Sequence, residues 1–465
     1  MRFHVLVSAA FLSLTLALLG CPMPPNPDGG TGGGRGGGNG GGGGTLTKFD
    51  VSVLDANAKD ATYLAIAVDG AQQRVGVVYL TPAGTTTMAG HPDYQIKYLE
   101  WKAGSIVVPP ENVRGVVQNF IGLAIAFDPT NGQPVVSYLG GPDGFVMGMS
   151  IFWFQSDAVI ARRGANGTWT ETTIATDGNQ VMCGNRVSDI GFLVGLWPAL
   201  TFDSTGKLYV GYRDGHNGQF PLQDWAGTDV EVWEGAPPGT GVCVAEGGNN
   251  KNAYGGHLRM VLGANNQPAI IHDQMFGDSD VNGQNVVFQQ RTPAGTWTQP
   301  GGSLLVISNT QSGASLAYDA TEGYGIAVLD RQTNQLGYIH SATGASWSGV
   351  DPVFGSGAGG WYPSLAMDPV FHEPAIAFYI CSARSSVTET GCNINEDELK
   401  VIQRVAGTWR EDLVDSEGGY LPQLGFFPDN MRSRRVVVYR TPPAIDPATG
   451  LTRTDVGQLK IAVER

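Results

Sequence analysis

Positive charge is scarce in this sequence. Among its 465 residues, 28 are Lys or Arg and 42 are Asp or Glu, so the formal net charge is −14 at pH 7. The basic residues form no cluster, whereas surfaces that bind nucleic acid or anionic lipid headgroups are rich in Lys and Arg. We therefore expect neither of these partners.

Several short catalytic motifs are also missing. The chain has no Gly-x-Ser-x-Gly elbow, no His-Glu-x-x-His zinc motif and no phosphate-binding loop. These absences argue against the hydrolases, metalloproteases and nucleotide-binding enzymes that depend on those motifs. Any catalytic residues are unknown at this stage.

An apolar run at the N-terminus is too short to cross a bilayer. Residues 5–19 form this run after a basic start at Met1-Arg2, and the run ends at Leu19-Gly20-Cys21. A transmembrane helix needs roughly 18 to 20 apolar residues. Residues 1–20 are therefore predicted to be a signal peptide of an exported protein.

The end of this segment resembles the bacterial lipobox, Leu-x-Gly-Cys. The resemblance implies that Cys21 is lipidated and becomes the mature N-terminus, and Pro22 implies anchoring at the outer membrane. The alternative is an ordinary secretory signal in which the cysteine is coincidental. Residues 22–44 are almost entirely Gly, Pro, Asn and Asp. Residues 21–44 are thus predicted to be a lipidated cysteine and a flexible tether with a span of about 25 Å.

A seven-residue segment recurs seven times, beginning at Tyr63, Gly122, Trp197, His257, Gly313, Tyr362 and Leu421. Small and large apolar side chains alternate within it, and a period of two is typical of a strand. Each copy continues with a turn, a second strand that usually ends in Tyr, a third strand, and a fourth strand that often opens with Gly-x-Trp, as at 167–169, 295–297 and 407–409.

A four-stranded unit of about 60 residues has the size of a propeller blade. The sequence therefore predicts an all-β fold, a seven-bladed β-propeller over residues 45–465. The segment Gly44-Thr-Leu-Thr47 matches Gly167-Thr-Trp-Thr170, so a strand over about residues 45–54 is expected to complete the last blade and close the ring. The alternatives are an open solenoid and a different number of blades.

Long insertions concentrate on one predicted face. Turns between the first and second and between the third and fourth strands are short, whereas the other connections carry insertions at 140–155, 177–190, 214–228, 235–254, 274–283 and 380–398. Long loops on a rigid scaffold usually carry recognition, so this long-loop face is expected to bind the ligand. The tether enters on the short-turn side, so the long-loop face is expected to point away from the membrane.

Four further cysteines lie in these insertions, and an even number in an exported protein predicts two disulfides. Cys381 and Cys392 share one insertion and are expected to pair. Cys183 and Cys243 each precede the first strand of their repeat by fourteen residues. Equivalent loops of adjacent blades can meet, so Cys183 and Cys243 are expected to form a disulfide.

Polar and aromatic residues gather at strand ends of the third to fifth repeats on the long-loop face. The candidate ligand-binding residues are Trp197, Tyr212, Arg213, Asp214, His257, His272, Asp273, Asp330 and Arg331. Such a group could perform general acid/base chemistry or bind an anionic or sugar ligand. The alternative is that these residues cap turns, as Asp commonly does.

Two insertions suggest further sites. Asp278, Asp280 and Asn282 have the spacing of calcium ligands, but Gln289 stands where a Glu closes the EF-hand loop, so a plain polar loop is the alternative. No other cofactor is expected. Residues 145–154 are more apolar than a solvated loop requires, which suggests a partner patch, a lid, or a hairpin that packs on the next blade.

The repeat resembles that of secreted bacterial propellers, with the sialidases as distant relatives. Sialidase Asp boxes have the form Ser-x-Asp-x-Gly-x-Thr-Trp, yet Gly164 and Asn166 stand where Asp and Gly should precede Trp169. No arginine triad can be assigned, so sialidase activity is not expected. We expect a monomeric lipoprotein that binds or scaffolds a protein or glycan ligand; the alternative is a glycan-directed hydrolase or lyase.

Overall fold

A computed structural model of the chain gives its fold. It describes residues 48–465 apart from segments 59–62, 87–91, 118–121, 142–144, 148–149, 153–156, 177–182, 184–193, 215–227, 236–238, 246–251, 277–283, 302–303, 309–312, 331–334, 355–358, 381–397, 417, 430–431, 442–443, 446–451 and 454–456. The predicted signal peptide, Cys21 and tether lie outside the described residues. So do Cys381, Cys392, Arg331 and the calcium candidates Asp278, Asp280 and Asn282.

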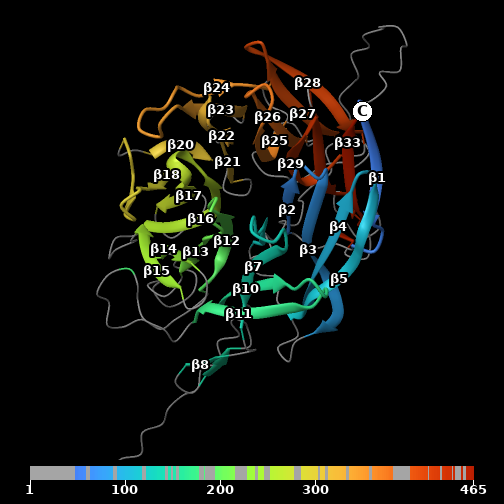
Figure 1. Ribbon diagram of the computed structural model, residues 1–465, viewed down its shortest axis with the longest axis vertical. Coiled ribbons are helices and arrows are strands. Elements are labelled where there is room, and N and C mark those ends of the chain that lie inside the picture. Colours follow the sequence, from blue (N-terminus) through green and yellow to red (C-terminus); the bar gives the residue numbers. More distant parts are fainter. Residues whose placement is uncertain are drawn as a thin grey trace, which may run out of the picture.

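Seven β-sheet blades form a ring, which confirms the predicted propeller (Figure 1). Blade 1 contains β2 (Leu64–Asp69), β3 (Arg74–Thr86), β4 (Pro92–Lys102) and β5 (Ser105–Val117). Blade 2 contains β6 (Ala124–Phe127), β7 (Pro134–Gly140), β10 (Asp157–Arg163) and β11 (Trp169–Ala175). Blade 3 contains β12 (Leu196–Phe202), β13 (Leu208–Asp214), β14 (Asp229–Glu234) and β15 (Thr240–Ala245).

The fourth strand of blade 4 is broken in two, and the other blades keep the pattern. Blade 4 contains β16 (Asn252–Leu262), β17 (Pro268–Phe276), β18 (Gln284–Arg291), β19 (Trp297–Thr298) and β20 (Leu304–Ser308). Blade 5 contains β21 (Ala314–Asp319), β22 (Gly323–Asp330), β23 (Gln335–Ser341) and β24 (Asp351–Pro352). Blade 6 contains β25 (Gly359–Met367), β26 (Pro374–Ile380), β27 (Glu398–Val405) and β28 (Thr408–Asp415).

Blade 7 combines strands from both ends of the described chain. It contains β29 (Tyr420–Asp429), β30 (Arg432–Arg440), β33 (Leu459–Glu464) and, on the outside, β1 (Phe49–Asp55). Strand β1 pairs antiparallel with β33, from Phe49 opposite Glu464 to Asp55 opposite Leu459. The N-terminal strand therefore closes the ring, as predicted.

The remaining elements are short. Strands β8 (Phe145–Met147) and β9 (Ser150–Phe152) form a separate two-stranded sheet, as do β31 (Ala444–Ile445) and β32 (Thr452–Arg453), and η1 (Ala264–Asn266) is a single helical turn. The apolar insertion at 145–154 thus includes a small hairpin. No helix in the described part of the chain has the length and apolar character that a membrane span requires.

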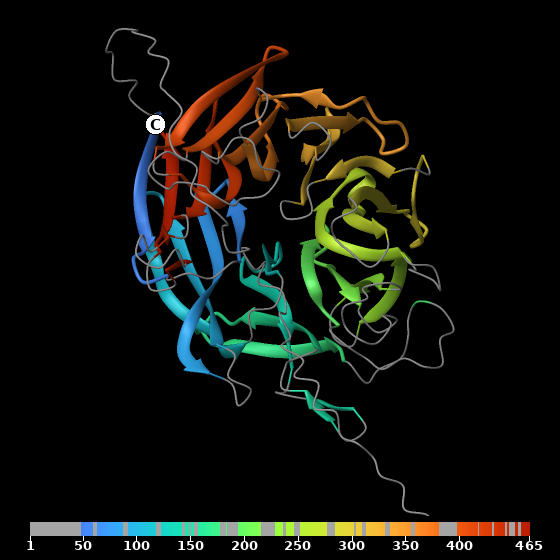
Figure 2. The ribbon, with the colours of Figure 1, turned by 180° about the vertical axis from the view of Figure 1, so that it is seen from behind.

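The seven repeat segments supply the first strand of each blade, and these inner strands surround the axis of the ring (Figure 2). Each contacts the inner strand of the next blade, and β29 contacts β2, which completes the cycle. The hydrophobic core lies between the blades, with a cluster of buried side chains at each of the seven interfaces. Both faces of a blade are thus covered, which explains why both alternating residue sets are apolar.

One expected insertion is wrong in part. Residues 235–254 include β15 and the start of β16, so only the stretch between these strands is a loop on that face. Cys243 therefore lies in a strand. Its disulfide with Cys183 is nevertheless present, with 5.0 Å between the Cα atoms and a sequence separation of 60. It joins the segment before blade 3 to the fourth strand of that blade.

The Gly-x-Trp motifs join neighbouring blades. Arg163, Arg291 and Arg404 shortly precede the motif in blades 2, 4 and 6 and bind Glu111, Glu234 and Glu322 of the preceding blade. The motif's Gly295 has φ of +91°, and a Cβ there would lie 3.2 Å from a guanidinium nitrogen of Arg291. A glycine therefore leaves room for the arginine to reach across the interface.

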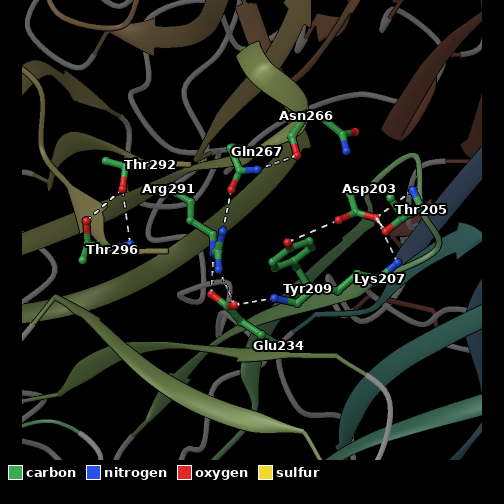
Figure 3. A network of polar contacts seen from close by, with 10 residues as sticks. All are labelled: Asp203, Thr205, Lys207, Tyr209, Glu234, Asn266, Gln267, Arg291, Thr292 and Thr296. Atoms are coloured by element: carbon green, nitrogen blue, oxygen red, sulfur yellow. Dashed lines mark hydrogen bonds and ion pairs between the residues drawn. The ribbon is translucent and has the colours of Figure 1, made fainter. Parts of the chain in front are cut away.

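We call each of these arginine–glutamate pairs between blades a clamp. A larger polar network surrounds the clamp between blades 3 and 4, which is the pair Arg291–Glu234 (Figure 3). Glu234 accepts two hydrogen bonds from Arg291, at 2.8 and 2.9 Å, and one from Lys207 Nζ at 2.8 Å. Arg291 also donates to Gln267 Oε1. The arginine that precedes the Gly-x-Trp motif of blade 4 thus links this blade to blade 3.

Candidate functional site

Most of the repeat segments begin with a residue in the left-handed conformation. At the first repeat position φ is positive in six of the seven blades, at Gly122, Trp197, His257, Gly313, Tyr362 and Leu421. Other residues rarely adopt this conformation, which costs on the order of 1 to 2 kcal/mol. At the four positions that are not glycine, a β-bulge interrupts pairing with the second strand. Bulges redirect side chains, and these four remain partly exposed.

Two of these side chains meet at the interface of blades 3 and 4. The ring centroids of Trp197 and His257 are 5.7 Å apart. His257 Nδ1 lies 2.7 Å from Oδ2 of Asp273, a residue within β17. An ionised carboxylate only accepts hydrogen bonds, so Nδ1 donates and a neutral imidazole keeps Nε2 as an acceptor. We call Trp197, His257 and Asp273 the Trp–His site.

Buried groups support the Trp–His site from within the blades. The guanidinium carbon of Arg213 lies 5.1 Å from the Trp197 ring centroid, and its Nε donates to Thr228 Oγ1 at 3.0 Å. Arg213 is fully buried, so it positions Trp197 and is not itself at the surface. On the other side, a Cβ at Gly313 would lie 2.6 Å from His257 Cγ. A glycine there makes room for the imidazole.

Blade 4 also departs from the repeat in its second strand. Elsewhere this strand often ends in a buried tyrosine that donates to a carboxylate, as Tyr138 does to Glu171 and Tyr439 does to Asp415. Burial, together with the hydrogen-bonded Glu171, raises the pKa of Tyr138 well above its usual range. His272 takes this place in blade 4, and burial lowers its pKa to about 4. The imidazole is therefore neutral at pH 7.

The other predicted residues lie at further strand ends of blades 3 and 5. Tyr212 is buried, and its hydroxyl donates to Glu231 Oε2 at 2.9 Å. Asp214 is buried opposite Asp229 of the adjacent strand. Asp330 is partly buried, and its backbone pairs with Ser308 of blade 4. The structure thus brings together Trp197, Arg213, His257 and Asp273 from the predicted set.

Turn capping does occur, but at the aspartates that end the repeat segments. Asp128, Asp203 and Asp368 each accept a hydrogen bond from the backbone N–H two residues later, at 2.8 to 2.9 Å. These contacts explain why Asp recurs at that position. The contact of Asp273 is of another kind, because its carboxylate binds the side chain of His257.

Two features of the inner strands were not predicted. Arg259 of β16 is exposed to solvent although it lies on the innermost strand. Tyr362 and Tyr420 of blades 6 and 7 contact each other, with 3.1 Å between their hydroxyl oxygens. Within the described residues, no group of three or more His, Cys, Asp or Glu side chains is placed to hold a metal ion.

No protein-family model matches the chain, and no curated protein matches it in sequence. Solved propellers are distantly similar. The BP39L lectin from Burkholderia pseudomallei is 12% identical over 88% of this chain and 98% of its own, with a TM-score of 0.44. A mutant of the NanB sialidase from Streptococcus pneumoniae is 12% identical over 89% of this chain and 71% of its own, also at 0.44.

An α-L-arabinanase from Penicillium chrysogenum is 11% identical over 90% of this chain and 97% of its own, with a TM-score of 0.41. These values describe a distant likeness of architecture. They say nothing of what this chain binds or whether it reacts with its ligand, so the function has to be argued from the side chains.

Proposed function

We propose that this protein is a lipid-anchored propeller of the cell envelope that binds or scaffolds a protein or glycan ligand at the Trp–His site. The observation that carries the proposal is the contact between two partly exposed rings, Trp197 and His257, at the interface of blades 3 and 4. The left-handed backbone recurs in other blades, so the imidazole held by Asp273 is what sets this pair of rings apart.

The chemistry of the site suits recognition. Ligand sites commonly combine aromatic surface with a few polar groups that fix orientation. The indole supplies apolar surface, and the imidazole, oriented by Asp273, supplies a polar ring atom. Because buried strands and Arg213 hold both rings, the site needs little reorganisation on binding, which favours affinity.

One observation favours a glycan-directed hydrolase or lyase as the second candidate. An imidazole held by a carboxylate at 2.7 Å, as in His257 and Asp273, is the arrangement of an oriented general base. Hydrolysis by two carboxylates would need a second acid across the scissile bond. Asp273 already binds His257, so the arrangement suits proton abstraction better than a carboxylate pair.

A glycan and peptide array probed with the full chain tests the proposal. We expect Trp197→Ala to abolish binding of the hits, because the indole is lost, and we expect Phe371→Ala to leave it unchanged. Phe371 is 58% exposed in a short turn between β25 and β26, so it is a matched exposed aromatic on the opposite face. Equal binding by both variants would contradict the proposed site, and turnover of a hit would favour the enzyme.

The anchor is tested separately by cell fractionation. We expect the full chain in the membrane fraction and the Cys21→Ser variant in the soluble fraction, since that thiol is the proposed lipid attachment point. Retention of the variant in the membrane would contradict lipid anchoring without affecting the Trp–His site.

A further inference from the structure

One charged side chain near the axis of the ring has no explanation in the repeat. Arg259 occupies the third position of its repeat segment on β16. The other six blades place small or uncharged residues there: Ala65, Ala124, Ala199, Ser315, Ser364 and Gln423. Departures from a repeat that otherwise serves packing are expected at functional positions. Blade 4 also carries the unusual His257 and His272.

The neighbouring blades explain why a small residue is normal at this position. Ser315 Oγ accepts a hydrogen bond from the backbone N–H of Leu365, and Ser364 Oγ accepts one from Leu424, each at 2.9 Å. The position therefore faces the inner strand of the next blade at close range. An arginine side chain does not fit such an interface, so Arg259 must extend beyond it.

The exposure and the surroundings of Arg259 indicate that its side chain lies in the central channel of the ring. It is the one exposed residue in the seven repeat segments, all of which the structure describes. Burial within the protein nevertheless lowers the pKa of its guanidinium, against the opposite effect of Asp273. Both observations hold for a side chain in the water-filled centre of a propeller, where solvent reaches the group but protein surrounds it.

The guanidinium of Arg259 uses few of its hydrogen-bond donors within the protein. In the described part of the chain its one hydrogen bond runs from Nη1 to the carbonyl oxygen of Leu258, at 3.0 Å. This bond holds the side chain against its own strand and uses one of five donors. The carboxylate of Asp273, whose negative charge favours the charged form of Arg259, already contacts His257. By contrast, Arg163 and Arg291 are satisfied by glutamates.

We propose that Arg259 binds the carboxylate of an acidic sugar whose ring lies against the Trp–His site. The inference deepens the proposed function and rests on it. Arg259 follows His257 by two residues on one strand, and His257 contacts Trp197, so a cation, an imidazole and an indole occupy one short stretch of the inner surface. A sugar acid presents the matching groups on one ring, namely a carboxylate, hydroxyls and an apolar face. Guanidinium pairs well with carboxylate because both are planar.

Calorimetry with two probes, one with free carboxylates and one with those carboxylates esterified, tests this assignment. The probes are a galacturonate oligosaccharide and its methyl ester, added to the full chain. We expect the acid to bind at least about 10-fold more tightly than the ester, the size of a charge-assisted hydrogen bond. In Arg259→Gln this preference should disappear, whereas Gln423→Ala should keep it. Gln423 is the matched control, because its Nε2 binds the preceding carbonyl in the same way.

The outcomes separate the inference from the proposed function. Equal affinity for acid and ester, or a preference that Arg259→Gln leaves intact, would overturn the inference. If Trp197→Ala removes binding of both probes while Arg259→Gln changes neither, the proposed function stands and the carboxylate assignment fails. Binding of an acidic peptide but of neither sugar would also overturn it. A melting curve for Arg259→Gln shows that the variant is folded.

Discussion

The clamp between blades 3 and 4 offers the most quantitative prediction. Glu234→Gln keeps the shape of the side chain but removes the charge that faces Arg291 and Lys207. Removing one partner of a buried pair costs about 3 to 5 kcal/mol, and an exposed pair contributes at most about 1 kcal/mol. The side chains of Glu234, Arg291 and Lys207 are 7%, 13% and 36% exposed. We therefore expect a loss of about 2 to 3 kcal/mol, measured by urea unfolding.

The equivalent clamp between blades 1 and 2 provides the control. Glu111 and Arg163 are 26% and 17% exposed, so Glu111→Gln should cost less, about 1 kcal/mol. A loss in Glu234→Gln no larger than in Glu111→Gln would refute the argument from burial. A decrease of the urea midpoint without a change of slope would confirm that stability alone has changed.

The same carboxylate carries a pH signature. Burial alone would raise the pKa of Glu234, but the hydrogen bonds from Arg291 and Lys207 outweigh it, and the net pKa is lowered. The folded state thus holds the carboxylate ionised below its ordinary pKa of about 4.3. Its contribution is complete above that pH and is lost as the pH falls through the folded pKa. The difference between the parent and Glu234→Gln should shrink below about pH 4.

Three further predictions concern the site and its frame. Gly313→Ala should weaken ligand binding, because its Cβ would lie 2.6 Å from His257 Cγ; Gly407→Ala, also at positive φ but with open space around it, should cost only about 1 kcal/mol of stability and leave binding intact. His272 has a folded pKa of about 4, below the ordinary 6.5, so its contribution is present above pH 6.5 and lost towards pH 4; His272→Gln should flatten that part of the stability profile, and parallel profiles would contradict it. Cys243→Ser should lower stability by up to about 4 kcal/mol in urea unfolding, because the disulfide spans 60 residues; an unchanged midpoint would contradict this estimate.

The fold was predictable because one pattern recurs in every blade. Seven aligned segments with alternating side chains indicate seven equivalent strands, and the Gly-x-Trp motifs mark the fourth strands. Strand β15 was missed because Gly241 stands in the tryptophan position of its blade. Trp233 of the adjacent strand packs against Gly239 instead, where a Cβ would lie 2.3 Å from the indole. In blade 3 the tryptophan therefore lies on the third strand and not on the fourth.

The site was predictable only in outline. The sequence could name Trp197, His257 and Asp273 as candidates, and the structure shows that they lie close together. Their left-handed backbone could not be foreseen, since Trp and His seldom adopt it. The burial of Arg213 also ran against the usual exposure of arginine. Arg259 was overlooked, although an arginine among six alanine, serine and glutamine residues is a visible signal.

The pairing of β1 with β33 has a consequence for folding kinetics. Hydrogen bonds such as that from Arg465 N to Lys48 O, at 2.9 Å, join residues from the two ends of the described chain. Closing a loop of roughly 400 residues costs on the order of 5 kcal/mol in chain entropy, and contacts of such long range form slowly. We expect β1 to dock last in refolding, and its backbone amides to exchange with deuterium earlier than those of the inner strands. The strand that closes the ring is thus also expected to be the last to fold and the first to open.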